Sequence, residues 1–219
     1  MTTLPLKRIA VLALPMAALA MTTSAQAQEW TPSRSIEFIA PANPGGGWDT
    51  LHDGGTANHA VDISGDDVIV RNFSAQTTAA GGTAYDGVHV AGARATVSTA
   101  KFVDSDDQAV HVAAGGDDCL IESCTVLDAD SIGVFIQAPR SRIINNRITV
   151  ASSEAGIDFR TTGDDGLAVG NIVQVGAGDP IAIDANNDNC VVVGNRTDGA
   201  VADNSGSALE ENLNVEIAF

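Results

Sequence analysis

The tetrapeptides GVHV at residues 87–90 and AVHV at residues 109–112 decide the fold, because variants of them recur along the chain. The other copies are AVDI at 60–63, GVFI at 133–136, GIDF at 156–159 and AIDA at 182–185. Successive copies start 22 to 27 residues apart, a period typical of solenoids, whose units bury their apolar faces against their neighbours. Apolar and polar residues alternate within most copies, which indicates strands. The sequence therefore predicts an all-β solenoid of about six coils.

A second apolar run follows most of the opening strands after a polar turn, and it usually ends on Asn. The closing residues are Asn72, Cys124, Asn146, Asn171 and Asn195. Asn tolerates left-handed backbone geometry, and its amide can bond to the Asn one coil away. Because stacked strands lie ~4.8 Å apart, the pattern predicts an amide ladder at one corner of the solenoid.

The repeat length and the corner pattern resemble the right-handed parallel β-helix of pectate-lyase-like and NosD-like repeat proteins. The resemblance covers residues 53–219 and implies the same fold for this segment. Proteins that share this pattern differ widely in activity, so the resemblance implies an architecture and leaves the reaction open.

The N-terminus has the features of an export signal. Lys7 and Arg8 precede an apolar run from Ile9 to Met21, and the small-residue site Ala25-Gln26-Ala27 follows. This arrangement predicts a secretory signal peptide over residues 1–27, and the run is short for a membrane span. We therefore expect a periplasmic or secreted protein without a membrane span after signal cleavage.

Residues 30–50 read WTPSRSIEFIAPANPGGGWDT. They resemble the start of the mature substrate-binding proteins of tripartite tricarboxylate transporters, in which a first strand leads into a PGGGxD loop. The resemblance implies that Gly45, Gly46, Gly47 and Asp49 are the remnant of an anion-binding loop, where glycines let backbone N–H groups approach an anion. It stops near Leu51, so we interpret residues 28–52 as a stub and linker, and the chain as a chimera.

The formal net charge is −17, and the excess lies after residue 51, where Lys101 is the only lysine. Such a chain repels phosphates, so nucleic acid is not expected as a partner. Asp-rich turns offer the oxygen ligands that Ca²⁺ prefers, which makes Ca²⁺ a candidate ligand, although a solubilising surface is the simpler explanation. In the predicted stack these turns alternate with Arg94 and Arg140, which indicates charge compensation at that place.

The middle residue of each opening strand is expected to point outward, because its aliphatic neighbours point inward. The outward column is Asp62, His89, His111, Phe135, Asp158 and Asp184. Adjacent coils place His89 and His111 about 5 Å apart, which is suitable for general acid–base catalysis. Arg160 lies two residues beyond Asp158 and suits a uronate carboxylate.

The column predicts a site that binds or processes acidic polysaccharide. The candidate catalytic residues are His89, His111, Asp158 and Asp184, and the candidate substrate-binding residues are Tyr85, Asp86, Gln137 and Arg160. Two histidines beside an acid are also a transition-metal pattern, but we assign no metal site. No complete catalytic motif is present, so enzymatic activity stays open, and His52 and His59 are interpreted as incidental.

Two other functions remain as alternatives. Outward strand positions need only be polar, which is what a structural or adhesive solenoid without catalysis requires. The N-terminal resemblance implies a remnant of a periplasmic carboxylate-binding protein. Cys119, Cys124 and Cys190 are interpreted as small buried residues, because Cys119 and Cys190 lie too many coils apart to form a disulfide.

Overall fold

The computed structural model describes residues 37–39, 50–52, 59–77, 85–152, 154–160, 162–205 and 214–216. Within these ranges the chain forms strands and no helix, and so no helix that could span a membrane. All of them belong to one unit, Pro32–Phe219. The predicted signal peptide and the residues Gly45, Gly46, Gly47 and Asp49 lie outside the described residues.

The strands form three parallel sheets, each built from every third strand of the chain except that β22 follows β20 in sheet B. Sheet A contains β1 (Glu37–Ile39), β4 (Ile69–Arg71), β7 (Thr96–Ser98), β10 (Leu120–Glu122), β13 (Arg142–Ile144), β16 (Leu167–Val169) and β19 (Val191–Val193). Sheet B contains β2 (Thr50–His52), β5 (Ser74–Gln76), β8 (Lys101–Phe102), β11 (Thr125–Val126), β14 (Arg147–Val150), β17 (Ile172–Val175), β20 (Arg196–Thr197) and β22 (Val215–Glu216). Sheet C contains β3 (Val61–Ile63), β6 (Val88–Val90), β9 (Val110–Val112), β12 (Val134–Ile136), β15 (Ile157–Phe159), β18 (Ile181–Ile183) and β21 (Ala202–Asp203).

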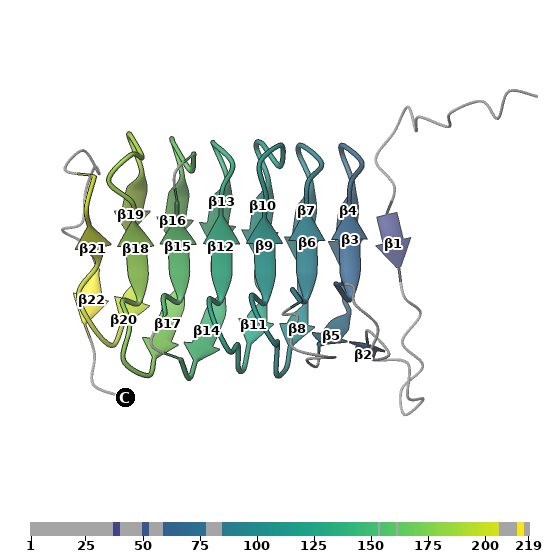
Figure 1. The fold of residues 1–219 in the computed structure, drawn as a ribbon, viewed down its shortest axis with the longest axis horizontal. Helices are drawn as coiled ribbons and strands as arrows, with labels where there is room; N and C mark the ends of the chain where they lie inside the picture. Colours follow the sequence, from purple (N-terminus) through teal and green to yellow (C-terminus); the bar gives the residue numbers. More distant parts are fainter. Residues whose placement is uncertain are drawn as a thin grey trace, which may run out of the picture. The chain divides into compact units, whose positions relative to one another are not determined.

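One coil is a strand of sheet C followed by one of sheet A and one of sheet B. Coil 1 is β3–β4–β5 and coil 6 is β18–β19–β20, and the strands of sheet C lie side by side in coil order (Figure 1). The prediction of an all-β parallel solenoid of about six coils is therefore confirmed. Strands β1 and β2 precede the predicted domain boundary at residue 53, and they pair in parallel with β4 and β5.

The core is a column of aliphatic side chains from all three sheets. In coils 2 to 6 of sheet C the residues that flank each outward position are buried, as with Val88 and Val90 in coil 2 and Ile181 and Ile183 in coil 6. Each such side chain packs between the coils above and below it, so burial is shared along the stack. This packing holds the outer face of sheet C in register.

The predicted amide ladder is present at the corner between sheets A and B. Asn146, Asn171 and Asn195 are buried, and each donates its Nδ2–H to the amide oxygen one coil on, at 2.9–3.0 Å. Asn214 closes the row, and Cys124 opens it by donating its backbone N–H to Asn146 Oδ1. The ladder thus satisfies the buried backbone and amide groups of this corner.

Asn72 was predicted to belong to this ladder, and that prediction is wrong. The register Arg71↔Ser98 places it one residue earlier, at the position of Asn145, and both residues have a φ near 55–58°. The sequence predicted that one Asn at each corner has the left-handed conformation and also makes the ladder bond. In the structure two consecutive residues share these roles: the first is left-handed and the second makes the bond. In coil 1 the ladder position holds Phe73, which is buried beside Phe102.

The predicted alternation of charges at the turns between sheets C and A is confirmed for two coils. Arg94 contacts Asp66 and Asp67 one coil before it, with its Nε 2.7 Å from Asp67 Oδ1. Arg140 makes the same contacts with Asp117 and Asp118, at 2.8 Å from Asp118 Oδ1. These pairs are largely exposed, so each adds little to stability.

The three cysteines are free and buried, as predicted. Burial raises the pKa of each thiol to about 11, and the thiolate is the reactive form. We expect no reaction of the native protein with a thiol-specific chromogenic disulfide near pH 8 and full reaction of all three after denaturation. A thiol that reacts in the native state, followed by mass spectrometry of labelled peptides, would contradict the burial of that residue.

Candidate functional site

The outward residues of sheet C form one aligned column. Parallel register places Asp62 beside His89, His89 beside His111, His111 beside Phe135 and Phe135 beside Asp158. Five of the six residues predicted for this column are therefore in it.

Asp184 is the exception, and its predicted register is wrong. Asp158 pairs with Ala182, so Asp184 lies two residues further along, beyond the end of β18. The reason is packing: Ile181 and Ile183 are both fully buried, so the strand of coil 6 is Ile181–Ile183, and Pro180 occupies the place held by Gly or Ala in earlier copies. Asp184 still lines the same pocket as Asp158.

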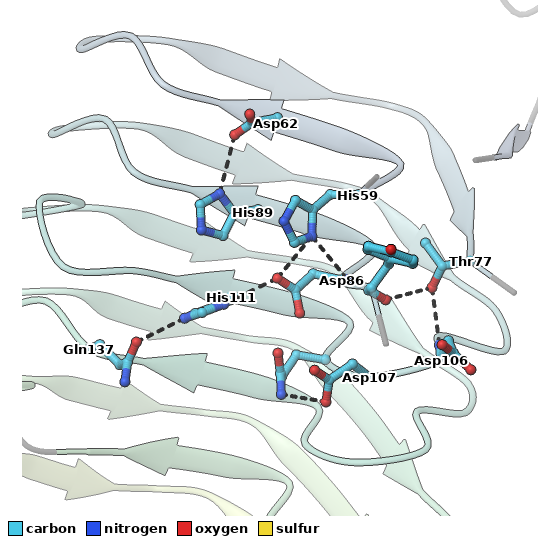
Figure 2. Close-up of polar contacts among 11 residues, drawn as sticks. His59, Asp62, Thr77, Asp86, His89, Asp106, Asp107, His111 and Gln137 are labelled. Carbon is cyan, nitrogen blue, oxygen red and sulfur yellow. Dashed lines mark hydrogen bonds and ion pairs between the residues drawn. The ribbon is translucent and has the colours of Figure 1, made fainter. Parts of the chain in front are cut away.

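His111 is held on both sides. Its Nδ1 lies 3.1 Å from Asp86 Oδ2, and its Nε2 lies 3.0 Å from Gln137 Oε1 (Figure 2). Both ring nitrogens are therefore occupied, so His111 has no free nitrogen with which to accept a substrate proton in this arrangement. Asp86 and Gln137 were both predicted to contact substrate. In the structure Asp86 is 2% exposed and contacts histidines, and Gln137 contacts His111.

His89 has a more open environment. Its Nδ1 lies 3.2 Å from Asp62 Oδ1, and its ring meets the ring of His111 edge-on with centroids 5.1 Å apart. The predicted proximity of the two histidines is therefore confirmed.

His59 belongs to the same cluster, and the interpretation of it as incidental is wrong. Its ring stacks on that of His89, with centroids 4.5 Å apart and an angle of 12° between the planes. Its Nδ1 lies 3.1 Å from Asp86 Oδ2 and accepts the backbone N–H of Asp86 at 3.1 Å (Figure 2). The register Val61↔Val88 places residue 59 opposite residue 86, so counting one period back from Asp86 would have found it.

The two histidines that share Asp86 have opposite pKa shifts. Burial lowers the pKa of His59 and outweighs the attraction of Asp86. Burial also opposes protonation of His111, but its hydrogen bonds with Asp86 and Gln137 and the charges of Asp86 and Asp107 raise its pKa overall. The side-chain hydrogen bonds of His111 with Asp86 and Gln137 thus distinguish the two sites.

Tyr85 lies behind this cluster and is 7% exposed. Its ring meets that of His59 edge-on at 6.1 Å, and its carbonyl oxygen accepts the hydroxyl of Thr77 at 2.9 Å. Its burial makes it a support for His59, so we do not retain the predicted contact with substrate.

A second group of residues lies over coils 5 and 6. Arg160 lies 2.8 Å from Asp158 Oδ2, and its guanidinium covers the ring of Phe135 at 5.3 Å from the centroid. Burial raises the pKa of Asp158, which is 4% exposed, although Arg160 opposes this shift. A pocket of about 370 Å³ opens beside this pair, and it is lined by residues that include Glu154, Asp158, Arg160, Asp179, Asp184 and Asn204.

The described residues contain no group of three or more His, Cys, Asp or Glu with the geometry of a metal site. At the acidic turns of coils 1 and 3, Arg94 and Arg140 bond the paired carboxylates. Ca²⁺ as a ligand stays a prediction, as do the export of the chain and its partners.

A family model described as "Right handed beta helix region" matches residues 54–215. No curated protein and no solved structure matches the chain. The match leaves out residues 30–50, so their resemblance to transporter binding proteins, and with it the chimera, stays a prediction.

Proposed function

The chain belongs to the right-handed β-helix family, and we propose that it is an exported protein that binds a polysaccharide along the outer face of sheet C and hydrolyses it. The observation that carries this proposal is the pocket beside Asp158, where a buried carboxylate with a raised pKa lies near a second carboxylate, that of Asp184. A concave site with a titratable group perturbed in this way is the usual place for acid–base chemistry.

Two carboxylates can divide the work of glycoside hydrolysis between them. Asp158, whose protonated form is favoured by burial, gives its proton to the glycosidic oxygen as the bond to the leaving sugar breaks. Asp184 takes a proton from the water that forms the new bond to the sugar. Arg160 bonds Asp158 and packs on Phe135, so it holds the acid in place.

The charges around the pocket favour a neutral or amine-bearing sugar over a uronate. Glu154, Asp158, Asp179 and Asp184 line the pocket with one guanidinium, that of Arg160, which already bonds Asp158. The chain as a whole carries −17, so the repulsion that argues against nucleic acid also applies to a polyuronate. We therefore replace the acidic polysaccharide of the sequence analysis with a neutral or amino polysaccharide.

The test uses the full-length chain against a neutral glucan, a neutral xylan, a deacetylated amino-sugar polymer and a polyuronate, each with and without Ca²⁺. We expect retention on the neutral or amino polymers and release of reducing ends. Both Asp158→Asn and Asp184→Asn are expected to lower the release rate by ~100-fold or more, because each removes one proton-transfer group. The matched control is Glu122→Gln on sheet A, which removes the same charge outside the pocket and is expected to retain the wild-type rate.

A structural or adhesive solenoid is the rival function, and the same experiment separates the two. A folded protein that neither retains nor cleaves any of the four polymers would contradict the proposal. Cleavage that survives both Asp158→Asn and Asp184→Asn would place the chemistry elsewhere on the face.

A further inference from the structure

We propose that His59, Asp86, His89 and His111 form a pH-sensitive clasp between coil 1 and coil 2, which holds one proton when closed and loosens when a second proton arrives. The proposal does not depend on polysaccharide binding, because it concerns how the first coil is attached. His59 and His111 contact Asp86 from the coils before and after it, and His89 stacks on His59 (Figure 2).

Asp86 lies at the centre of the clasp, and its Oδ2 lies 3.1 Å from two imidazole nitrogens, His59 Nδ1 and His111 Nδ1. Its side chain is 3% exposed, so these contacts replace water as its partners. One proton on His111 gives a buried ion pair with Asp86, and Gln137 Oε1 can accept the other N–H of that ring. The first proton therefore completes the clasp.

His59 Nδ1 has conflicting neighbours. It accepts the backbone N–H of Asp86 at 3.1 Å and also faces the carboxylate of Asp86 at 3.1 Å. A nitrogen cannot accept from one and donate to the other at the same time. The neutral ring with its proton on Nε2 keeps the backbone bond, whereas a protonated ring loses it and competes with His111 for Asp86.

The charge of His111 adds to the cost of the second proton, because His111 already carries the first one when His59 takes up the second, and this charge lowers the pKa of His59. The ring of His89 stacks on that of His59, with centroids 4.5 Å apart. Asp62 lies 3.2 Å from His89 and its charge favours protonation of His59, but its side chain is largely exposed to solvent. Among the described residues, Asp107 also acts on the clasp, through its charge on His111.

The pKa directions give the order of the two protons. The pKa of His111 is raised, so this residue stabilises the fold below its ordinary pKa of ~6.5, and the contribution is lost as the pH rises through the raised value. The pKa of His59 is lowered, so its contribution is present above ~6.5 and is lost as the pH falls through the lowered value. As the pH falls, His111 therefore takes up its proton before His59 does, and the later protonation of His59 opens the clasp.

The backbone bonds beside His59 report the opening. The amide of Ala60 donates to Asp86 O at 3.2 Å and that of Val61 donates to Gly87 O at 3.1 Å, which joins coil 1 to coil 2. The equivalent bonds deeper in the stack are donated by the amide of Gly133 to Ala155 O and by that of Val134 to Gly156 O. The residue two places before Val134 is Ile132, where coil 1 has His59 before Val61, so these bonds serve as the internal control.

The experiment is an NMR titration of the histidine rings together with amide hydrogen exchange at about pH 7.5 and about pH 5, corrected for the intrinsic rate. We expect His111 to titrate above the ordinary histidine value and His59 below it. Protection of the Ala60 and Val61 amides should fall by ~10-fold or more at the lower pH, while that of Gly133 and Val134 is unchanged.

The variant His59→Gln cannot take up the second proton, so the acid-dependent loss of protection at Val61 should disappear. The control is Glu122→Gln, which removes a titratable side chain on sheet A and should leave the acid effect in place. A His59 that titrates at or above the ordinary value, or Ala60 and Val61 amides equally protected at both pH values, would overturn the proposal. Both readings come from the unaltered protein, so the test holds even where His59→Gln does not fold.

Discussion

The variant Asn171→Ala is expected to lower the free energy of unfolding by about 4 kcal/mol, because it empties the centre of the amide ladder. Asn171 is fully buried; its Nδ2 donates to Ile143 O and to Asn195 Oδ1, and its Oδ1 accepts two N–H groups of Asn146. Alanine leaves these partners without a bond in a region that water does not reach, at a cost of ~1–3 kcal/mol for each unsatisfied group. Thermal unfolding followed by circular dichroism should show a midpoint lower by ~8–16 °C.

The control is Asn186→Ala, an exposed residue of coil 6, which is expected to change stability by less than ~0.5 kcal/mol. If Asn171→Ala does not fold, Asn214→Ala at the end of the ladder gives a milder version, because Asn214 is only partly buried. Equal stability of Asn171→Ala and Asn186→Ala would mean that the ladder contributes no more than a surface amide.

The recurring tetrapeptide predicted the fold because in a solenoid the period of the sequence is the period of the structure. Each copy from Ala60 to Phe159 contains a strand of sheet C, and from coil 2 on the flanking aliphatics are its buried positions. The corner Asn residues predicted the ladder for the same reason. Local spacing is sufficient here, since each coil of a solenoid packs only against its neighbours.

The errors of register have a common physical cause: a shift of one residue moves a side chain to the other side of a strand, and a shift of two keeps the side but can move the residue beyond the end of a short strand. In coil 6 the similarity of AIDA to GIDF hid the pair Ile181 and Ile183, whose burial sets the register of β18. His59 was missed because it precedes the first copy of the phrase. Its importance follows from the contact with Asp86 across coils, which becomes visible only when the residues directly before each copy are aligned.

The sequence predicted which residues lie on the outer face of sheet C, but it predicted only part of what each of them contacts. The sequence placed His89 and His111 together, and the structure does so at 5.1 Å between ring centroids. It could not show that Asp86 and Gln137 occupy both nitrogens of His111, because those contacts depend on side-chain directions at the strand ends. The same limit applies to the pocket beside Asp158, whose walls come from loops that differ between coils.

Phe159→Ala is expected to destabilise the fold by about 4 kcal/mol and to disturb the pocket above it. Phe159 is fully buried, and it lies between Asp158 and Arg160 in sequence, so its ring anchors the end of β15 that presents both side chains. Removing a buried aromatic ring loses its transfer free energy and leaves a cavity that the neighbouring coils cannot fill. Chemical denaturation measures the loss, with Phe159→Leu expected to lose less and Leu127→Ala, an exposed position, expected to lose under ~0.5 kcal/mol.

The glycine that faces this ring allows a test of the cause. A Cβ added at Gly166 would lie 2.5 Å from Cε1 of Phe159 and 2.9 Å from the carbonyl oxygen of Gly163. Gly166→Ala should therefore be destabilising alone and less so in the Phe159→Ala background, because the ring that its methyl group meets is gone. Strictly additive effects in this double-mutant cycle would contradict the packing of Phe159 against Gly166 and, with it, the role of this ring in holding Asp158 at the pocket.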